Sequence, residues 1–146
     1  MAAEDFGFGA FVAGTASRLL HVATLLTGEP AEPPGANPHA QRLVAAALGT
    51  AYARWDRLRG EDPYAYTRRE LTVRFARTAW RFHRGRGGLL CRLTPQERLA
   101  VVLRLYEGLY EEQVAALMGL PHERVRALCR HAVGTLRSTP RRAAAS

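Results

Sequence analysis

The sequence predicts an all-α protein made of two small helical domains joined by a short linker. Apolar residues recur at spacings of three, four and seven in several segments, which is the pattern of helices with one buried side. No segment alternates between apolar and polar residues over a useful length, so we expect no β-sheet. A glycine-rich break at residues 85–88 divides the chain into a larger N-terminal and a smaller C-terminal part.

Three helices are expected in the first domain, residues 1–84. The stretch at residues 29–38 holds four of the eight prolines and is therefore a loop. Residues 60–63, with a glycine, an aspartate and a proline, form a turn. The predicted helices span Phe6 to Thr27, His39 to Leu58 and Tyr64 to Arg84.

The second domain opens with a strong helix start. Thr94 can cap the helix, Pro95 suits the first helical position, and Glu97 can complete a capping box. We place the linker at residues 85–93, the second domain at 94–138 and a disordered tail at 139–146. Because each half alone is small for independent stability, we expect the halves to pack together. Three apolar linker residues also need to be buried, namely Leu89, Leu90 and Leu93.

A helix-turn-helix at residues 111–128 is the strongest local signal. Ala115 supplies the small residue that two closely packed helices need, and Gly119 supplies a turn residue that tolerates positive φ. Pro121 then suits the start of the second helix. The apolar wedge shared by the two helices consists of Val114, Met118, Leu120, Val125 and Leu128.

The second helix of this motif is the candidate recognition helix, which would enter the major groove of duplex DNA. With Val125 and Leu128 facing inward, its outer side and flanks carry basic residues that can bind phosphates or guanine. The alternative is a helical hairpin whose arginines are only solvated, and outward Glu123 favours it because a carboxylate repels phosphate. The candidate DNA-binding residues are Arg124, Arg126, Arg130 and His131.

A second basic surface is expected on the helix predicted at residues 64–84. Its apolar side carries Leu71, Phe75 and Phe82, and an almost purely basic stripe lies opposite. Arginines beside an aromatic ring are typical of surfaces that follow a nucleic-acid backbone and stack on a base, although Trp80 could equally belong to the core. The candidate residues of this stripe are Arg74, Arg77, Arg81 and Trp80.

The overall charge favours a polyanionic partner. The formal charge is +8, and all 21 basic residues of the 146 are arginine; the sequence pI is about 10.7. This balance is typical of proteins that bind nucleic acid, and a codon bias towards arginine is the alternative. Cys91 and Cys129 match no metal or redox spacing, so we expect no metal site.

Several classes of protein are excluded by what the sequence lacks. The five histidines are scattered, and no carboxylate pair, nucleophile motif or phosphate loop is present, so we expect neither an enzyme nor a cofactor. No signal peptide is apparent, and no apolar run approaches the roughly 20 residues that cross a bilayer. We therefore expect a cytoplasmic protein that binds no membrane.

The order of these motifs resembles the extracytoplasmic-function sigma factors of actinobacteria. The resemblance covers nearly the whole chain, and it rests on the order of the motifs more than on any one of them. They are Leu25-Leu26-Thr27-Gly28, Tyr52-Ala53-Arg54-Trp55-Asp56-Arg57-Leu58, Pro63-Tyr64-Ala65-Tyr66-Thr67-Arg68-Arg69, Leu93-Thr94-Pro95-Gln96-Glu97-Arg98 and the helix-turn-helix.

This resemblance implies a sigma region 2-like helical bundle followed by a sigma region 4-like helix-turn-helix. It further implies that the first domain docks on core RNA polymerase and opens the downstream promoter element, while the second reads the upstream element. By position, the arginines of the recognition helix and His131 would contact upstream DNA. The basic stripe would face the downstream element, and residues 60–64 would form the loop that holds a flipped base.

The sequence departs from the family on the helix that docks on polymerase. The family's acidic residue followed by Leu-Val-Gln-acidic is replaced here by Arg42-Leu43-Val44-Ala45-Ala46, so the charge of the contact is reversed. Val73 also replaces an asparagine that is common on the basic helix, and Tyr110 stands where a capping serine is usual. The altered surface becomes a candidate site for another protein, with Arg42, Leu43, Ala45, Ala46 and Gly49 as its residues.

The linker is the second departure. The ten residues from Gly85 to Thr94 span at most about 36 Å, whereas the two promoter elements lie on the order of 50 Å apart. We therefore expect a sigma-like regulator that binds double-stranded DNA but docks weakly on polymerase. The alternatives are a working sigma factor that recruits core RNA polymerase, and a sigma-like protein-interaction module without DNA binding. An anti-sigma or other regulatory protein is a further candidate partner.

Overall fold

The computed structural model describes the backbone of residues 2–138 and the side chains of residues 7–138. Within this part of the chain all regular structure is helical, which confirms the all-α prediction. The predicted tail at 139–146 lies outside the described residues. The longer helices are α1 (Ala2–Thr27), α2 (Pro38–Ala53), α3 (Pro63–Arg77), α4 (Pro95–Val101), α5 (Glu111–Met118) and α6 (His122–Arg137). The short turns are η1 (Trp55–Arg57), η2 (Ala79–Phe82) and the π-helical η3 (Val102–Tyr106).

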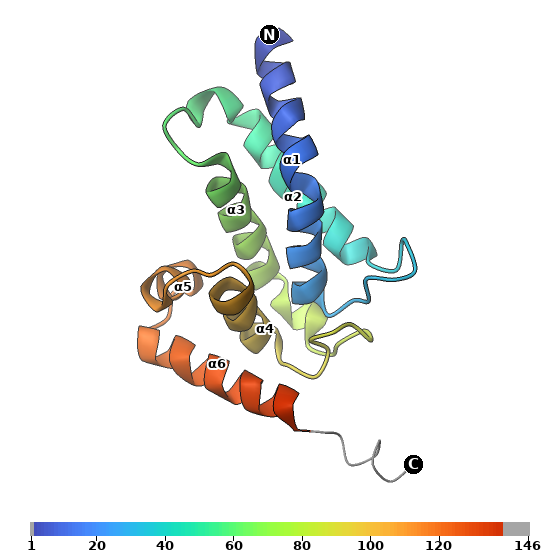
Figure 1. The fold of residues 1–146 in the computed structure, drawn as a ribbon, viewed down its shortest axis with the longest axis vertical. Helices are drawn as coiled ribbons and strands as arrows, with labels where there is room; N and C mark the ends of the chain where they lie inside the picture. Colours follow the sequence, from blue (N-terminus) through green and yellow to red (C-terminus); the bar gives the residue numbers. More distant parts are fainter. Residues whose placement is uncertain (1, 139–146) are drawn as a thin grey trace.

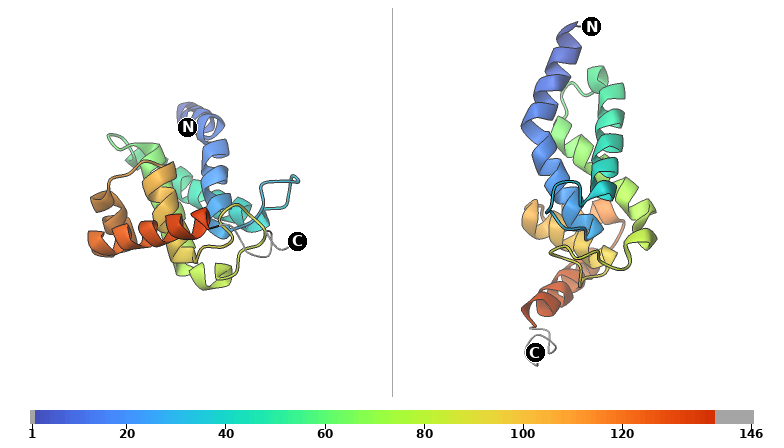
Figure 2. Two further views of the ribbon diagram at one scale, coloured as in Figure 1. Left: turned by 60° about the horizontal axis from the view of Figure 1, so that its bottom comes forward. Right: turned by 90° about the vertical axis from the view of Figure 1, so that its right-hand side faces the viewer.

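The helices form two layers that meet end to end (Figure 1). Helices α1, α2 and α3 lie side by side as an N-terminal bundle, and α4, α5 and α6 pack at one end of that bundle. Figure 2 shows α6 running across the far end of the molecule, away from the N-terminus of α1. The outer side of α6 therefore forms one end of the molecule.

Helix α1 is the central helix of the core. Its residues Leu19, Val22 and Leu26 are almost completely buried against the neighbouring helices. The expectation that no apolar run approaches membrane-spanning length is wrong, because Gly7–Thr27 is long and apolar enough by length and composition. The many alanines and glycines of this stretch, with Arg18 as its one charge, produce this property without a run of leucines. The buried residues of this stretch lie between Leu19 and Thr27, where α1 packs in the core.

The start of α2 is capped by a residue from the proline-rich loop. Glu29 is buried, and its carboxylate accepts hydrogen bonds from the backbone N–H groups of His39 (3.1 Å) and Ala40 (2.9 Å). The hydroxyl of Thr27 donates a third bond of 2.8 Å to the same carboxylate. A negative charge at this helix end is favourable because the unpaired N–H groups carry partial positive charge. The loop therefore ties the end of α1 to the start of α2.

Helix α3 ends earlier than predicted. The helix expected over residues 64–84 stops at Arg77, and the 3₁₀ turn η2 follows after Thr78, whose backbone is not helical. The hydroxyl of Thr78 donates to the carbonyl of Arg74 at 3.1 Å, a local bond that competes with the helical pattern. Because of this break, Trp80 and Arg81 do not continue the stripe of α3 but lie on η2.

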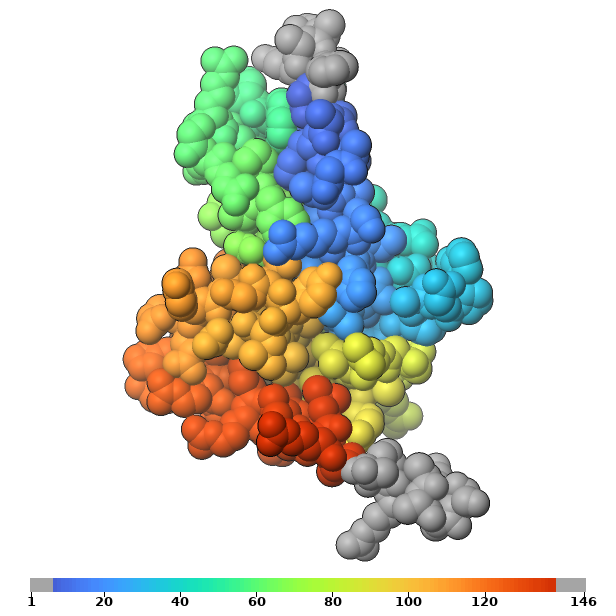
Figure 3. All heavy atoms as spheres, in the orientation of Figure 1, coloured from blue at the N-terminus to red at the C-terminus, as the bar shows by residue number. Residues whose placement is uncertain are grey.

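One hydrophobic core runs through both halves and through the linker. It joins residues of α1, α2 and α3 to Leu99, Leu103, Val114 and Val125 of the C-terminal half. This arrangement agrees with the expectation that the halves pack together, and Figure 3 shows the two halves in contact without a gap on the face drawn. The boundary between the predicted domains is therefore not a boundary of the core.

The linker is part of this core. Leu90 and Leu93 are buried as expected, but Leu89 is 79% exposed, so the expectation for that residue is wrong. The backbone N–H groups of Arg86 and Gly88 both donate to the carbonyl of Gly28, each at 2.9 Å. A Cβ at position 88 would lie 2.2 Å from the carbonyl oxygen of Glu29, so only glycine fits this approach. This tight turn directs Leu89 outward.

Helix α4 starts as the sequence predicts. The Thr94 hydroxyl accepts from the Glu97 N–H at 3.2 Å, and the Glu97 carboxylate accepts from the Thr94 N–H at 2.9 Å. These two bonds form the predicted capping box. The helix then continues into the π-helical turn η3, which ends at Tyr106.

Candidate interaction surfaces

The helix-turn-helix is built as predicted. Gly119 between α5 and α6 has φ +68°, the left-handed conformation that the tight turn requires. Val114 of α5 and Val125 of α6 are fully buried against each other's helices, and Leu128 is nearly so. This wedge leaves the opposite side of α6 to solvent.

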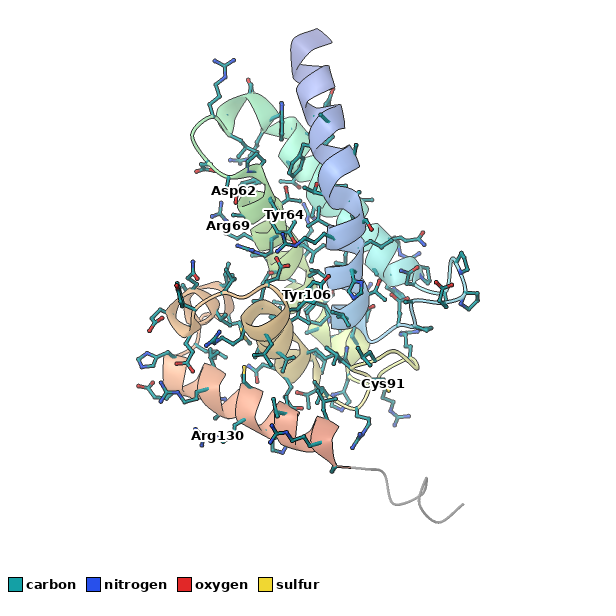
Figure 4. The ribbon with its side chains drawn as sticks, in the orientation of Figure 1. Asp62, Tyr64, Arg69, Cys91, Tyr106 and Arg130 are labelled. Carbon is teal, nitrogen blue, oxygen red and sulfur yellow. The ribbon has the colours of Figure 1, made fainter. Side chains whose placement is uncertain are left out.

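Two of the predicted DNA-binding arginines are exposed and available. Arg124 and Arg130 make no ion pair with any residue that the structure describes. Figure 4 shows Arg130 on the outer side of α6. His122 at the first turn of α6 lies 3.2 Å from the carboxylate of Glu123, which partly engages the acidic group noted on the outer side.

The third predicted arginine is already paired. Arg126 donates two hydrogen bonds to Glu111 at the start of α5, at 3.1 and 2.9 Å. The hydrogen bond from this guanidinium lowers the pKa of Glu111 below its ordinary value of 4.5. A DNA phosphate would have to displace Glu111 to reach both donors of Arg126, so this residue is less available than its neighbours.

His131 is also engaged. Its Nδ1 forms a short hydrogen bond with the Glu97 carboxylate, which links α6 to the start of α4. Burial would by itself raise the pKa of Glu97, but the bonds from Thr94 and His131 outweigh it and lower that pKa. The His131 ring is therefore held at the side of α6.

A groove separates α6 from the turn η2, and we call it the α6 groove. Its volume is about 710 Å³, and both halves of the chain line it. Trp80 and His83 come from the N-terminal half, whereas Arg124, Ala127 and His131 come from α6. Trp80 could belong to the core or to the surface by its sequence position. Its side chain is 73% exposed, so it belongs to the surface. The lining of the groove is mainly apolar, and its charged or titratable residues are Arg124, His83, His131 and Glu97.

The basic stripe is spread over two elements. Arg74 on α3 is half-buried and donates a hydrogen bond of 2.5 Å to the hydroxyl of Thr50 on α2. Arg77 is exposed at the end of α3. Arg81 on η2 lies over the ring of Trp80, with its guanidinium carbon 5.2 Å from the ring centre. The four predicted residues are thus neighbours, but they do not form one straight stripe.

The candidate partner surface on α2 is mostly exposed. Arg42, Ala45 and Gly49 are exposed, and Ala46 is partly so. Leu43 is partly buried and packs against the core, so its side chain supports the fold as well as the surface. The Arg42 guanidinium donates to the Nδ1 atom of His39 at 3.1 Å.

Sequence reasoning missed two contacts that join the halves, and Arg98 makes the first. This arginine is completely buried. It donates to the carbonyls of Leu93 (3.1 Å) and Leu26 (2.7 Å) and, by a short bond, to that of Phe82. Burial lowers the pKa of Arg98, although a guanidinium stays charged in proteins. One cation thus holds the ends of α1, η2 and the linker.

Glu107 makes the second contact. Its side chain is 0% exposed and follows directly after η3. It accepts hydrogen bonds from Arg18 of α1 and from Arg68 (3.0 Å) and Tyr64 (2.9 Å) of α3. Burial first, and then the Glu107 carboxylate, raise the pKa of the Tyr64 phenol well above its usual range.

Aromatic packing strengthens the same junction. Tyr106 stacks on His21 of α1 with ring centres 5.1 Å apart, and Figure 4 shows Tyr64 and Tyr106 near the place where the two halves meet. Apart from Leu93, the contact partners of Arg98 and Glu107 are distant in the sequence, so no local pattern indicates them. An arginine in the first turns of a helix otherwise reads as a solvated residue.

Comparison with known proteins supports the C-terminal assignment. Residues 89–138 match the family described as sigma-70, region 4. This segment contains the linker leucines and the helix-turn-helix, and it is less than half of the chain. The match supports a sigma-factor-like protein. No curated protein matches the chain in sequence.

A solved structure shares the fold across both halves. It is the co-crystal structure of the anti-anti-sigma factor PhyR complexed with the anti-sigma factor NepR from Bartonella quintana, with a TM-score of 0.57. The similarity covers 88% of this chain and 48% of that chain, at 21% identity. This chain thus spans about half the length of the chain it resembles, and the likeness is one of fold. The family match supports a sigma-like C-terminal half, and the solved structure supports a shared fold.

Proposed function

We propose that this protein is a sigma-like transcription regulator that works as one closed body and binds a regulatory protein of the anti-sigma class. The observation that carries the proposal is the pair of contacts that join the halves, made by Arg98 and Glu107. Both are buried and both are charged, so separating the halves would leave unpaired groups on each side. A non-enzymatic role in the cytoplasm, where the chromosome lies, is part of the proposal.

The closed body argues against the usual action of a sigma factor. Two promoter elements about 50 Å apart cannot both be reached by halves that share one core, unless the core opens. The reversed charge of Arg42 further weakens docking on a polymerase surface that accepts an acidic residue. We therefore expect weak binding to core RNA polymerase, or none, through the usual contact.

A protein partner fits the α6 groove. The groove is lined by both halves, so a helix that fills it would bind only the closed body. Its exposed Trp80 offers the kind of large aromatic anchor that dominates protein interfaces. The fold neighbour, PhyR, is described in complex with an anti-sigma factor, which supports a partner of this class for the present chain.

Duplex DNA is the second candidate ligand, and the exposed arginines of α6 favour it. Arg124 and Arg130 are exposed on the helix-turn-helix and have no ion-pair partner among residues 7–138, and they lie within the segment that matches sigma-70 region 4. Replacing a phosphate-contacting arginine by alanine should lower the salt dependence of DNA binding by about one charge. If the variant Arg124→Ala with Arg130→Ala keeps wild-type DNA affinity and salt slope, α6 does not read DNA.

The deciding test combines two binding experiments on the purified protein. One uses core RNA polymerase with run-off transcription alongside, and sub-micromolar binding with promoter-specific transcripts would overturn the proposal. The other uses affinity capture with wild-type protein and with Ala127→Glu, which adds a second carboxylate to the α6 groove beside that of Glu97. A protein that is captured by the wild type and not by the variant is then purified, and its direct binding to the wild-type chain is measured. Arg59→Ala, at an exposed arginine outside the groove, is the matched control.

A further inference from the structure

A second groove lies between α2 and α3, on the surface where Arg42 reverses the expected charge. Its volume is about 330 Å³, and its lining includes four arginines, which are Arg42, Arg74, Arg77 and Arg81. Arg42 is the only arginine of α2, while the other three come from α3 and η2. The polar residues His39 and Thr78 complete the donors and acceptors of this α2–α3 groove.

The positive charges of this groove are not compensated by the protein. No carboxylate lines the groove, and none of its four arginines forms an ion pair with any residue in the described part of the chain. Glu29, which contacts the backbone of His39, is buried and uses its oxygens to cap α2. The four arginines therefore line one groove without a carboxylate partner among the described residues.

Arg74 shows that donors remain unused. One terminal nitrogen donates to Thr50, but its Nε atom is buried and has no hydrogen-bond partner. A buried charged donor without an acceptor costs free energy. An anion in the groove would compensate the charge of this guanidinium without bonding to Nε itself. Arg42 in turn forms a side-chain hydrogen bond with Nδ1 of His39, which is not a carboxylate.

We propose that the α2–α3 groove binds the oligophosphate group of a small molecule, meaning two or more linked phosphates as in a nucleoside diphosphate or triphosphate. Guanidinium groups match phosphate oxygens in geometry and charge. Four of them around a site of this size suit an anion that concentrates several charges, and the volume lies in the range of small-ligand pockets. This inference does not depend on the proposed function.

A nucleic-acid strand suits the groove less well. A strand binds through stacking of its bases on exposed rings as well as through its phosphates. The exposed ring of Trp80 lies under the guanidinium of Arg81, but it lines the α6 groove and not the α2–α3 groove. The aromatic residue that does line it, Phe82, is 3% exposed and packs in the core. The groove thus offers phosphate donors without a platform for bases.

The test is calorimetric titration of the full chain with sodium tripolyphosphate, at low and at physiological salt. We expect saturable binding at one site, with orthophosphate at least about tenfold weaker. Arg42→Ala and Arg77→Ala should each weaken binding about tenfold, the equivalent of one charge-assisted hydrogen bond. Both residues are exposed, so the variants should keep the wild-type circular dichroism and melting temperature. Arg59→Ala removes the same charge elsewhere and should change the affinity less than about twofold.

Four results would overturn the inference. The first is no binding of tripolyphosphate at low salt, and the second is an equal loss of affinity in Arg59→Ala and Arg42→Ala. The third is a short oligothymidylate that binds more tightly than tripolyphosphate and depends on the same arginines. The fourth is an acidic peptide that binds more tightly through these arginines. The last two would identify the groove as a track for a strand or as a protein contact. Competition by nucleoside triphosphates, with the same dependence on Arg77, would support the inference and distinguish a nucleotide from free polyphosphate.

Discussion

Replacing Arg98 by methionine should destabilise the protein strongly. Methionine keeps much of the apolar stem but removes all donors to the carbonyls of Leu26, Phe82 and Leu93. Each charge-assisted bond contributes about 1.5–3 kcal/mol. Two effects offset part of the summed free energy of these bonds. The variant no longer buries a guanidinium, and water can reach the carbonyls that have lost their donor. We therefore expect a loss of about 3–5 kcal/mol in the free energy of unfolding, as when one partner of a buried charged contact is removed.

The assay is urea unfolding followed by circular dichroism, with Arg92→Met as the control. Arg92 also donates to backbone carbonyls, those of Thr135 and Ser138, but it does so at the surface. We expect its loss to cost less than about 1 kcal/mol, because exposed contacts of charged groups contribute little. If Arg98→Met costs no more than Arg92→Met, the buried arginine does not hold the halves together.

Three further predictions concern the same junction and its surroundings. Glu107→Gln should return the pKa of the Tyr64 phenol towards its ordinary value of 10.0, measured by ultraviolet titration, and an unchanged pKa would contradict the contact. Glu97 has a lowered pKa, so its stabilising contribution is present above its ordinary value of 4.5 and is lost as the pH falls through the lower value of the folded state. Glu97→Gln should flatten the dependence of unfolding free energy on pH in that acidic window, and an identical slope would argue against it. Gly88→Ala should lower the melting temperature, because its Cβ would lie 2.2 Å from the carbonyl oxygen of Glu29, and a stable variant would contradict the tight turn.

The parts of the fold that depend on local chemistry were predictable. The capping box of Thr94 and the positive φ of Gly119 follow from residue types at fixed offsets, and the structure contains both. The end of α3 was not predictable, because neither glycine nor proline marks it, and the break coincides with the hydroxyl of Thr78 bonding back to Arg74. The spacing of apolar residues continues past Thr78, so periodicity alone predicts a longer helix.

The candidate sites were predictable only in part. The exposed arginines of α6 follow from helical geometry once the buried wedge is known. The pairing of Arg126 with Glu111 depends on the angle between two helices, which periodicity does not contain. In the same way, Arg42 and Arg77 were assigned to separate surfaces, although the packing of α2 on α3 places both in one groove. A contact between distant elements is a property of the assembled core.

The buried Arg98 has a consequence for how this chain can change over evolutionary time. Its three acceptors lie at the end of α1, on η2 and in the linker, whereas the arginine itself belongs to α4. A C-terminal half exchanged for that of another protein would bring its own residue to this position, and the carbonyls of the N-terminal half would then lack their donor. The helix-turn-helix of this chain is therefore not an interchangeable cassette, and the two halves are expected to be inherited and to diverge as one unit.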